Sequence, residues 1–477
     1  MLGQRRGGGE FTENLLERAL DQAGLSGPDR GLCHELVIGV VRWQATLDWL
    51  IARKTPGRTQ KPALQDLLRL GLYQIFWLDR IPPHAAVHET VEQAKRAGFG
   101  PQAGFLNAVL RGYLREADET RRQLEELKVS LPAAGWSHPD WLVERWRRLF
   151  GDEPARQLLE WNNRPAKLMA RVNTLKANAG QLVEQWRNEN VDYDFFTRDW
   201  TGENLIFELK SPPPLASLKS FHEGWFYVQD PSTLLAVREL DPRPGETLLD
   251  LCAAPGGKTT FCAQLMNNQG RIVAHDIETR RVALIEENCA RLGVICVKTS
   301  LSDLDRPHPD TLPQEREQPS SGLITSGTTL TNPAPGSSGV RGTILPLPGG
   351  EGRGEGERKQ TFRSSLLASS FDKVLVDAPC SNTGVLRRRV DLRWRITPAE
   401  LERLRATQLE LLLQASHSVR PGGVLVYSTC SLEPEENSEV VKQFLSEVSG
   451  FALERERLLT PFADSVDGAF VARLRRA

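Results

Sequence analysis

The stretch Asp250-Leu-Cys-Ala-Ala-Pro-Gly-Gly-Lys-Thr-Thr260 decides the fold of this chain. The apolar run Thr247–Cys252 predicts a buried strand, and the residues from about Lys258 onward predict a helix. Gly256 and Gly257 between them permit a sharp turn and a close approach of the backbone to a ligand. Because ligands of doubly wound sheets bind near the first strand-to-helix turn, we expect a binding site here.

The ligand of this turn is not expected to carry a phosphate chain. A P-loop needs a glycine five residues before Gly257, where Cys252 stands, and the dinucleotide fingerprint G-x-G-x-x-G does not occur. The next apolar run, Arg271–Ile277, contains Asp276 at its end. An acid at the end of the second strand binds a ribose diol in this architecture, although an exposed Asp at a strand end is also common. Together these features suggest S-adenosylmethionine.

The rest of the chain after residue 236 alternates between strand and helix patterns, which predicts a parallel, doubly wound sheet buried on both faces. A helix is expected from Pro398, with Thr397 as its N-cap. The segment at about 306–368 is rich in proline, glycine, serine and threonine and predicts a disordered insertion between the third and fourth strands. The five predicted strands are Thr247–Cys252, Arg271–Ile277, Val294–Lys298, Lys373–Asp377 and Gly423–Ser428.

Two thiols follow the fourth and fifth strands, in Asp377-Ala-Pro-Cys-Ser-Asn-Thr-Gly384 and Tyr427-Ser-Thr-Cys-Ser-Leu-Glu-Pro-Glu-Glu-Asn437. Cys380 and Cys430 should therefore lie at the sheet edge that holds the glycine turn. Buried small residues are the ordinary alternative for cysteine, and a zinc site is disfavoured because other ligands are missing. A thiol beside a methyl-donor site has a chemical use in the methylation of carbon 5 of cytosine, which needs a thiolate to add at carbon 6. Asp377 would stabilise charge on the pyrimidine, while the spacing leaves open which thiol attacks.

A basic run lies directly after the Cys380 loop and includes Trp394. Arginine and aromatic side chains beside such a site predict contacts with RNA phosphates and bases, and a solvated helix start is the alternative. The predicted RNA contacts are Arg387, Arg388, Arg389 and Arg393.

The residues before 236 predict two further domains. Residues 1–135 have helical periodicity throughout, and residues 136–235 mix helix and strand patterns in a small α+β connecting domain. His84 and His88 are four residues apart but have no third ligand nearby, so we expect no metal. The third domain is 236–477.

Composition fits these predictions without requiring them. The net charge of −1 means that any RNA-binding surface must be local. The chain begins without the apolar run of a secretory signal and has no run long enough to span a membrane. Its 7 cysteines suit a reducing cytoplasm, and we expect a cytoplasmic monomer.

These motifs resemble the bacterial 16S rRNA (cytosine-5)-methyltransferase RsmB (Sun/Fmu) family. The resemblance rests on DLCAAPGGKTT at 250–260, DAPCSNTG at 377–384 and YSTCSLEPEEN at 427–437. RIPPHAAVHETVE at 80–92 and FLNAVLR at 105–111 resemble the NusB-like helical domain of that family, and Arg171-Val-Asn173 the start of its connecting region. It implies an all-α NusB-like RNA-binding domain, a small α+β connecting region that also binds RNA, and a Rossmann-like class I methyltransferase domain.

The resemblance also implies roles for individual residues. Cys430 would be the nucleophile, and Cys380 would assist release of the product. The acid after the third strand would be Asp303, displaced by about two residues from the family pattern. By this resemblance, the chain lacks most of the first NusB-like helix, and the insertion is absent from the family pattern. The cofactor would contact Cys252, Ala253, Ala254, Pro255, Gly256, Gly257, Lys258, Asp276, Asp303 and Asp377.

The expected substrate is small-subunit ribosomal RNA, because of the NusB-like domain. Transfer RNA and large-subunit ribosomal RNA are alternatives for the same catalytic domain. A catalytically inactive RNA-binding assembly factor is a third alternative, which the intact thiol pair and glycine turn disfavour.

Overall fold

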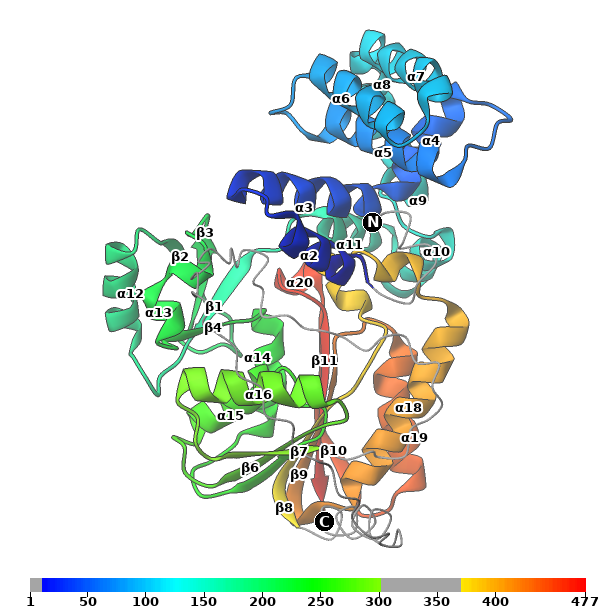
Figure 1. The fold of residues 1–477 in the computed structure, drawn as a ribbon. Coiled ribbons are helices and arrows are strands. Elements are labelled where there is room, and N and C mark those ends of the chain that lie inside the picture. The colour runs from blue at the N-terminus through cyan, green and yellow to red at the C-terminus, as the bar shows by residue number, and fades with distance from the viewer. Residues whose placement is uncertain (1–10, 302–369) are drawn as a thin grey trace, which may run out of the picture.

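The structure, a computed structural model, describes residues 11–301 and 370–477. It contains a helical N-terminal region, a four-stranded sheet and a seven-stranded sheet, in that order along the chain (Figure 1). The predicted fold class is therefore confirmed. The predicted insertion at about 306–368 and Asp303 lie outside the described residues.

The N-terminal region is built from helices that bury apolar faces against one another. Pro83 begins one of these helices, and the apolar residues from Leu32 to Leu50 belong to two helices that meet at Trp43. None of the helices in the described ranges is long and apolar enough to cross a membrane. The helices are α2 (Thr12–Ala23), α3 (Gly27–Arg42), α4 (Gln44–Lys54), α5 (Pro62–Trp77), α6 (Pro83–Arg96), α7 (Ala103–Arg115), α8 (Ala117–Ser130), α9 (Pro132–Gly135), α10 (Asp140–Phe150) and α11 (Asp152–Asn163).

The four-stranded sheet is antiparallel, with the order β2-β3-β1-β4. Trp186 is fully buried, and its ring contacts Phe207 and Phe226 edge-on. The same apolar core continues into the seven-stranded sheet, so the two sheets form one packed unit. The elements are β1 (Leu168–Val172), α12 (Ala179–Asn188), β2 (Asp192–Phe196), β3 (Ile206–Lys210), α13 (Lys219–His222) and β4 (Phe226–Val228).

The seven-stranded sheet has the order β10-β11-β9-β8-β5-β6-β7. The five strands from β9 to β7 are parallel, as predicted, whereas β11 pairs antiparallel with β9 and with β10. These last two strands were not predicted, because β10 is a charged, exposed edge strand without an apolar run. The strands are β5 (Thr247–Asp250), β6 (Arg271–Asp276), β7 (Val297–Leu301), β8 (Phe371–Asp377), β9 (Val419–Thr429), β10 (Phe451–Leu459) and β11 (Ala469–Arg476).

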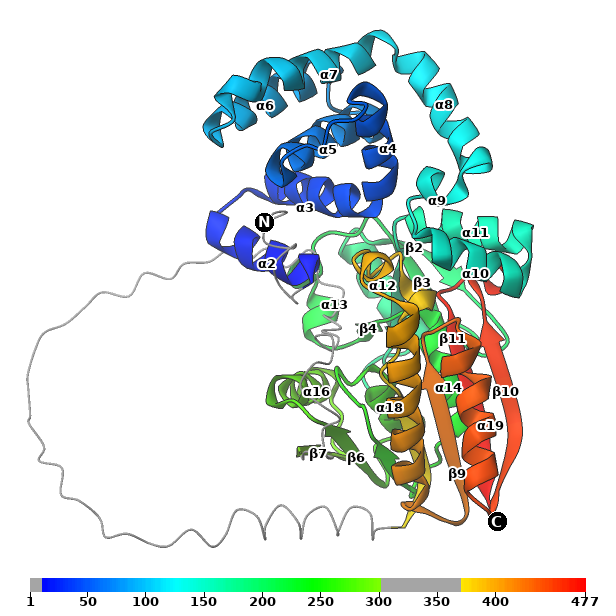
Figure 2. The same cartoon turned by 90° about the vertical axis from the view of Figure 1, so that its right-hand side faces the viewer.

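Helices cover both faces of this sheet (Figure 2). Adjacent residues of a strand point to opposite faces, and Leu248 and Leu249 accordingly belong to two different apolar cores. Thr397 caps α18 by accepting a hydrogen bond from the backbone N–H of Glu400, as predicted. One face carries α14 (Leu234–Leu240), α15 (Gly257–Leu265) and α16 (Thr279–Leu292), and the other α18 (Pro398–Ser416) and α19 (Ser438–Glu447), while α20 (Pro461–Asp464) precedes β11.

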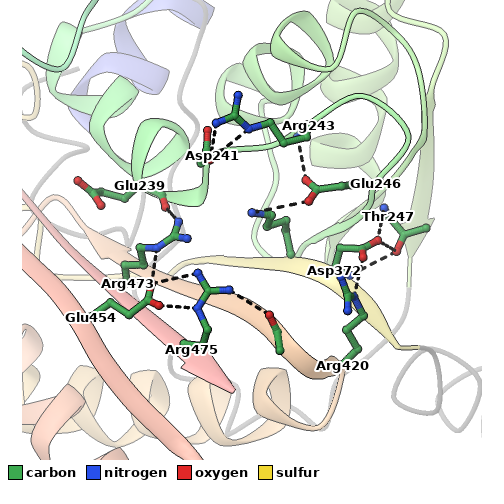
Figure 3. A network of polar contacts seen from close by, with 12 residues as sticks. Glu239, Asp241, Arg243, Glu246, Thr247, Asp372, Arg420, Glu454, Arg473 and Arg475 are labelled. Atoms are coloured by element: carbon green, nitrogen blue, oxygen red, sulfur yellow. Dashed lines mark hydrogen bonds and ion pairs between the residues drawn. The ribbon is translucent and has the colours of Figure 1, made fainter. Parts of the chain in front are cut away.

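The two ends of the parallel strands have different surroundings. Their carboxyl ends point toward the helical region (Figure 1), which contacts the loops there through Thr12 with Asp391 and through the Trp394 indole with the Val41 carbonyl. Their amino ends carry a network of charged side chains (Figure 3). In it Asp372 accepts hydrogen bonds from the Thr247 backbone and hydroxyl, both at 2.7 Å.

Candidate active site

The glycine turn connects β5 to α15 at the carboxyl end of the sheet, as predicted. Gly256 has a φ of +100°, a conformation that side chains other than glycine rarely adopt. A Cβ atom on Gly257 would lie 3.1 Å from the Tyr227 ring, so a larger residue at this position would require that ring to shift. The backbone of the turn is therefore free to approach a ligand closely.

Asp276 lies beside this turn at the end of β6. Its carboxylate accepts the Ala254 N–H at 3.2 Å and pairs with Arg281, which also donates to the Ala254 carbonyl at 3.3 Å. The carboxylate is almost fully buried. The same carboxylate accepts the backbone N–H groups of Ile277 at 2.9 Å and Glu278 at 3.5 Å, so these contacts fix its orientation beside the turn.

Asp250 is a buried acid beneath the turn that sequence reasoning did not single out. The Thr259 hydroxyl donates to one of its oxygens at 2.7 Å, and the other oxygen has no partner among the described residues. Burial raises the pKa of Asp250 to about 7, the Thr259 hydrogen bond opposes this, and the nearby charge of Asp377 adds to it.

Asp377, at the end of β8, contacts the turn from the other side. Lys258 donates to it at 2.5 Å, and the Ser428 hydroxyl donates to its other oxygen at 2.6 Å. An ammonium and a carboxylate are thus presented together between the turn and the thiol loops. The side chain of Asp377 keeps 29% of its surface exposed, which a group that acts on a bound base requires.

The two thiols lie side by side, as their places after adjacent parallel strands predicted. The sulfur atoms of Cys380 and Cys430 are 3.3 Å apart. The Cys430 thiol also donates to Oδ1 of Asn382 at 2.8 Å, and the Asn382 amide donates to the Cys380 carbonyl at 2.7 Å. Both thiols are unoxidised.

Two buried acids of the Cys430 loop were also missed by sequence reasoning. Glu436 contacts the residues that follow both thiols, and Glu433 accepts a hydrogen bond from the Trp146 indole at 3.0 Å and pairs with Arg145 of α10. The helical segment before the four-stranded sheet therefore contacts the thiol loop directly. The only available sequence signal was the cluster of three glutamates after Cys430, which reads as a solvated loop.

Arg171, expected only at the start of the connecting region, also contacts the helix that follows the glycine turn. Its guanidinium is buried, and it donates to the Gly257 carbonyl at 2.9 Å and to the Thr260 hydroxyl at 3.2 Å. Burial lowers its pKa to about 9. Because Arg171 belongs to β1, the four-stranded sheet holds the start of α15, on which the glycine turn depends.

The predicted RNA contacts of the arginine run need correction. Arg387 is buried against Trp161 and pairs with Asp230 and Asp467. Arg393 is fully buried, and its donors reach backbone carbonyls and an amide oxygen of the helical region.

A buried guanidinium has no surface for a phosphate, so the predicted RNA contacts of Arg387 and Arg393 are wrong, and both arginines join parts of the chain instead. Arg388 is half-buried and pairs with the same two aspartates, and Arg389 lies 3.7 Å from Glu13. The charge of these side chains is visible in the sequence, but the acids with which they pair are not.

In 11–301 and 370–477, no three His, Cys, Asp or Glu side chains are grouped so that they could hold a metal ion. The arrangement instead combines a nucleoside-type turn, an exposed carboxylate and a thiol pair. Chemically, this can bind a donor without phosphates and attack an electrophilic ring carbon.

Comparison with protein families gives three matches along the chain. Residues 237–318 and 356–475 match the 16S rRNA methyltransferase RsmB/F family. Residues 3–115 match the NusB family, and residues 138–197 match the ferredoxin-like domain of RsmF/B-like methyltransferases.

Individual relatives extend over nearly the whole chain. A probable ribosomal RNA small subunit methyltransferase B from Bacillus subtilis is 33% identical, covering 92% of this chain and 85% of the relative. A protein of the same name from Synechocystis sp. is 32% identical, covering 98% and 96%. A solved structure of a methyltransferase homologue from Pyrococcus horikoshii is 26% identical with a TM-score of 0.52, covering 72% of this chain and 97% of that protein.

Proposed function

Because this chain belongs to the RsmB/F family of 16S rRNA methyltransferases, we propose that it methylates carbon 5 of a cytosine in small-subunit ribosomal RNA through a covalent bond to Cys430. The observation that carries the covalent mechanism is the pair of sulfurs 3.3 Å apart, on loops that follow adjacent strands beside Asp377. The enzyme is S-adenosylmethionine-dependent, as its family is. The substrate RNA is assigned from the matched NusB family segment and the relatives.

The residues around the glycine turn fit S-adenosylmethionine. Asp276 presents a carboxylate to a ribose diol. The Lys258 ammonium, which also pairs with Asp377, is available to the carboxylate of S-adenosylmethionine. The turn from Cys252 to Gly257 offers backbone close to the ligand without a phosphate-binding pattern. When bound, the cofactor supplies a methyl group activated by a sulfonium. Asp303, the remaining candidate, lies outside the described residues.

Cys430 acts on the pyrimidine ring. Its thiol loses a proton, its sulfur bonds to carbon 6, and the electron pair of the C5–C6 double bond becomes available at carbon 5. Carbon 5 would then accept the methyl group that the bound cofactor supplies, and the bond between that methyl group and the sulfonium sulfur would break. A base removes the proton from carbon 5, and the sulfur–carbon 6 bond breaks to restore the double bond. Cys380, whose sulfur is in reach of the same adduct, assists this last step.

Asp377 serves the ring rather than the sulfur. Lys258 and Ser428 fix the orientation of its carboxylate, and its exposed surface is available to the ring nitrogen N3. Stabilising the charge that develops on the ring lowers the barrier to thiolate addition. Asn382 cannot take up the Cys430 proton, because an amide oxygen is too weak a base, so it orients the thiol only.

Matched thiol variants test the mechanism. We expect Cys380→Ala to accumulate a covalent protein–RNA adduct, seen as a slower band on denaturing gels, because product release is impaired. Cys430→Ala should form no adduct and no product. The reverse pattern would exchange the two roles, and failure of both to affect methylation would exclude covalent catalysis by this pair.

The substrate requires a test in cells. Bisulfite sequencing of ribosomal and transfer RNA from a strain that lacks this protein should show one cytosine of 16S RNA without its methyl mark. Loss of a mark in transfer RNA or large-subunit RNA instead would identify the alternative substrates. If no mark is lost, the chain is not a cytosine-5 methyltransferase in that cell, and an assembly role would be favoured.

A further inference from the structure

Each of the two thiols is followed in sequence by a serine, Ser381 after Cys380 and Ser431 after Cys430. The carboxylate of Glu436 contacts both serines. It accepts the Ser381 backbone N–H at 2.8 Å, the Ser381 hydroxyl, and the Ser431 hydroxyl at 2.5 Å. One side chain therefore joins the two thiol loops at the residue next to each sulfur.

Glu436 is itself held from two further directions. Gln408 of α18 donates from the same amide nitrogen to the Glu436 carboxylate at 3.0 Å and to the Pro379 carbonyl at 2.9 Å. Tyr427 of β9 donates its hydroxyl to the Glu436 backbone carbonyl at 2.6 Å. The position of the carboxylate is thus fixed relative to a helix and a strand of the sheet.

Burial of the Glu436 carboxylate costs stability, which a purely structural role would not require. Glu436 is fully buried, and removing an ionised carboxylate from water is unfavourable before its hydrogen bonds are counted. Burial raises its pKa, and the hydrogen bonds from Ser381, Ser431 and Gln408 oppose that rise. An apolar residue would fill the same space without this cost, but it would not join the two loops.

We propose that Glu436 is a positioning residue that fixes the separation of the Cys380 and Cys430 sulfurs. At 3.3 Å the second thiol lies within reach of any ring carbon that the first one has attacked. A looser loop pair would still let one thiol attack but would slow release by the other. This catalytic consequence rests on the proposed function, whereas the geometric claim does not.

The geometric claim is tested with Glu436→Gln and a matched control, Glu439→Gln, which makes the same charge change three residues further on, in the first turn of α19. Diamide oxidises the thiol pair: the two thiols lose two electrons and two protons, which reduce diamide to its hydrazine, and a disulfide forms. Peptide mapping follows the Cys380–Cys430 bond and separates it from those of the other cysteines. We expect Glu436→Gln to lower the rate at which this disulfide forms by about tenfold, because disulfide formation needs close and oriented thiols. Glu439→Gln should react like the unmodified protein.

Thermal unfolding of each variant shows whether the fold is intact. If Glu436→Gln does not fold, Ser431→Ala removes one of the two joined contacts and should also slow the bond. The double variant Ser381→Ala/Ser431→Ala should show less than the sum of the single effects, since both act through one carboxylate. Oxidation at the unmodified rate in folded Glu436→Gln, or in Ser431→Ala if the first variant fails, would overturn the proposal.

The outcome is separable from that of the proposed function. The oxidation assay contains neither RNA nor cofactor. An effect of Glu436 on oxidation in a protein that forms no RNA adduct would refute covalent methylation alone. An active enzyme whose oxidation rate is unchanged by Glu436→Gln would refute only the positioning role. In an active enzyme we expect Glu436→Gln to retain adduct formation but to lower product release, a split that simple loss of stability would not give.

Discussion

The two ends of the parallel strands use the same residue types for opposite purposes. At the amino ends, Asp372 and Glu246 are matched with Arg420 and Lys373, and Glu454 is matched with Arg473 (Figure 3). These groups satisfy one another. At the carboxyl ends, several acids lie close to the two thiols, and one oxygen of the buried Asp250 has no hydrogen-bond partner among the described residues.

The difference is clearest in two aspartates of neighbouring strands. Asp372, at the start of β8, accepts two hydrogen bonds from Thr247 and one from Arg420, and these hydrogen bonds lower its pKa despite its burial. Asp250, at the end of β5, has one hydrogen bond, and burial raises its pKa to about 7. A buried acid with a raised pKa is typical of a functional site, whereas a fully paired acid is typical of a structural contact. The comparison therefore favours the carboxyl ends as the place where binding and chemistry occur.

The largest contrast should appear in the reaction rate. We expect Asp377→Asn to lower kcat by about 10²- to 10⁴-fold, since the amide cannot carry the charge that stabilises the ring. Asp372→Asn, at the other end of the same strand, should leave kcat within about twofold of the unmodified enzyme, a limit set by its distance from the chemistry. Single-turnover methylation measures both. Equal losses would show that the two ends are not functionally distinct.

The next contrast lies in the pH dependence of stability. The folded state favours the protonated form of Asp250, so its contribution to stability is complete below an unfolded pKa of about 3.9 and is lost as the pH rises toward about 7. Asp250→Asn removes this titration. We therefore expect the variant to gain on the unmodified protein by a few kcal/mol between about pH 4 and about pH 8, at roughly 1.4 kcal/mol per unit of pKa shift.

Asp372 should behave with the opposite sign. Its lowered pKa makes its contribution present above the unfolded pKa and lost as the pH falls through the folded value. Urea unfolding of both Asn variants at several pH values checks the pair. If the difference in the free energy of unfolding between Asp250→Asn and the unmodified protein is constant across this range, the pKa of Asp250 is not raised.

Only some features of the two ends could be predicted from the sequence. Strand tips and thiols were predictable because parallel strands bring their carboxyl ends to one edge, and the resemblance supplied the roles. The arginine run was misread because its partners Asp230 and Asp467 are distant in sequence and lie in stretches without periodic pattern. Glu436 was missed for a related reason, because a buried acid next to polar residues has the same local pattern as an exposed one. Asp250 lies between Leu249 and Leu251 in a predicted strand, but the pattern does not show which contacts a buried acid makes.

At the amino end, stability should respond to individual pairs in proportion to their burial. We expect Asp372→Ala to lower the free energy of unfolding by about 1–3 kcal/mol, because the Thr247 N–H loses its acceptor in a partly buried place. Denaturant unfolding at neutral pH measures this change. A neutral effect would mean that water replaces the carboxylate there.

The smallest expected effect separates two arginines that share the Glu454 carboxylate. The Arg473 side chain is 12% exposed and also reaches the Glu239 carbonyl, whereas that of Arg475 is 41% exposed. An exposed ion pair contributes only about 0–1 kcal/mol, since water and salt screen it. Arg475→Ala should therefore change the free energy of unfolding by less than about 1 kcal/mol, and added salt should reduce that change further. Arg473→Ala should cost more, because the Glu239 carbonyl that loses its donor is partly buried, whereas the Gly422 carbonyl to which Arg475 donates is exposed. If the two variants lose equal stability, burial does not rank the contacts at this end, and the contrast with the carboxyl end rests on chemistry alone.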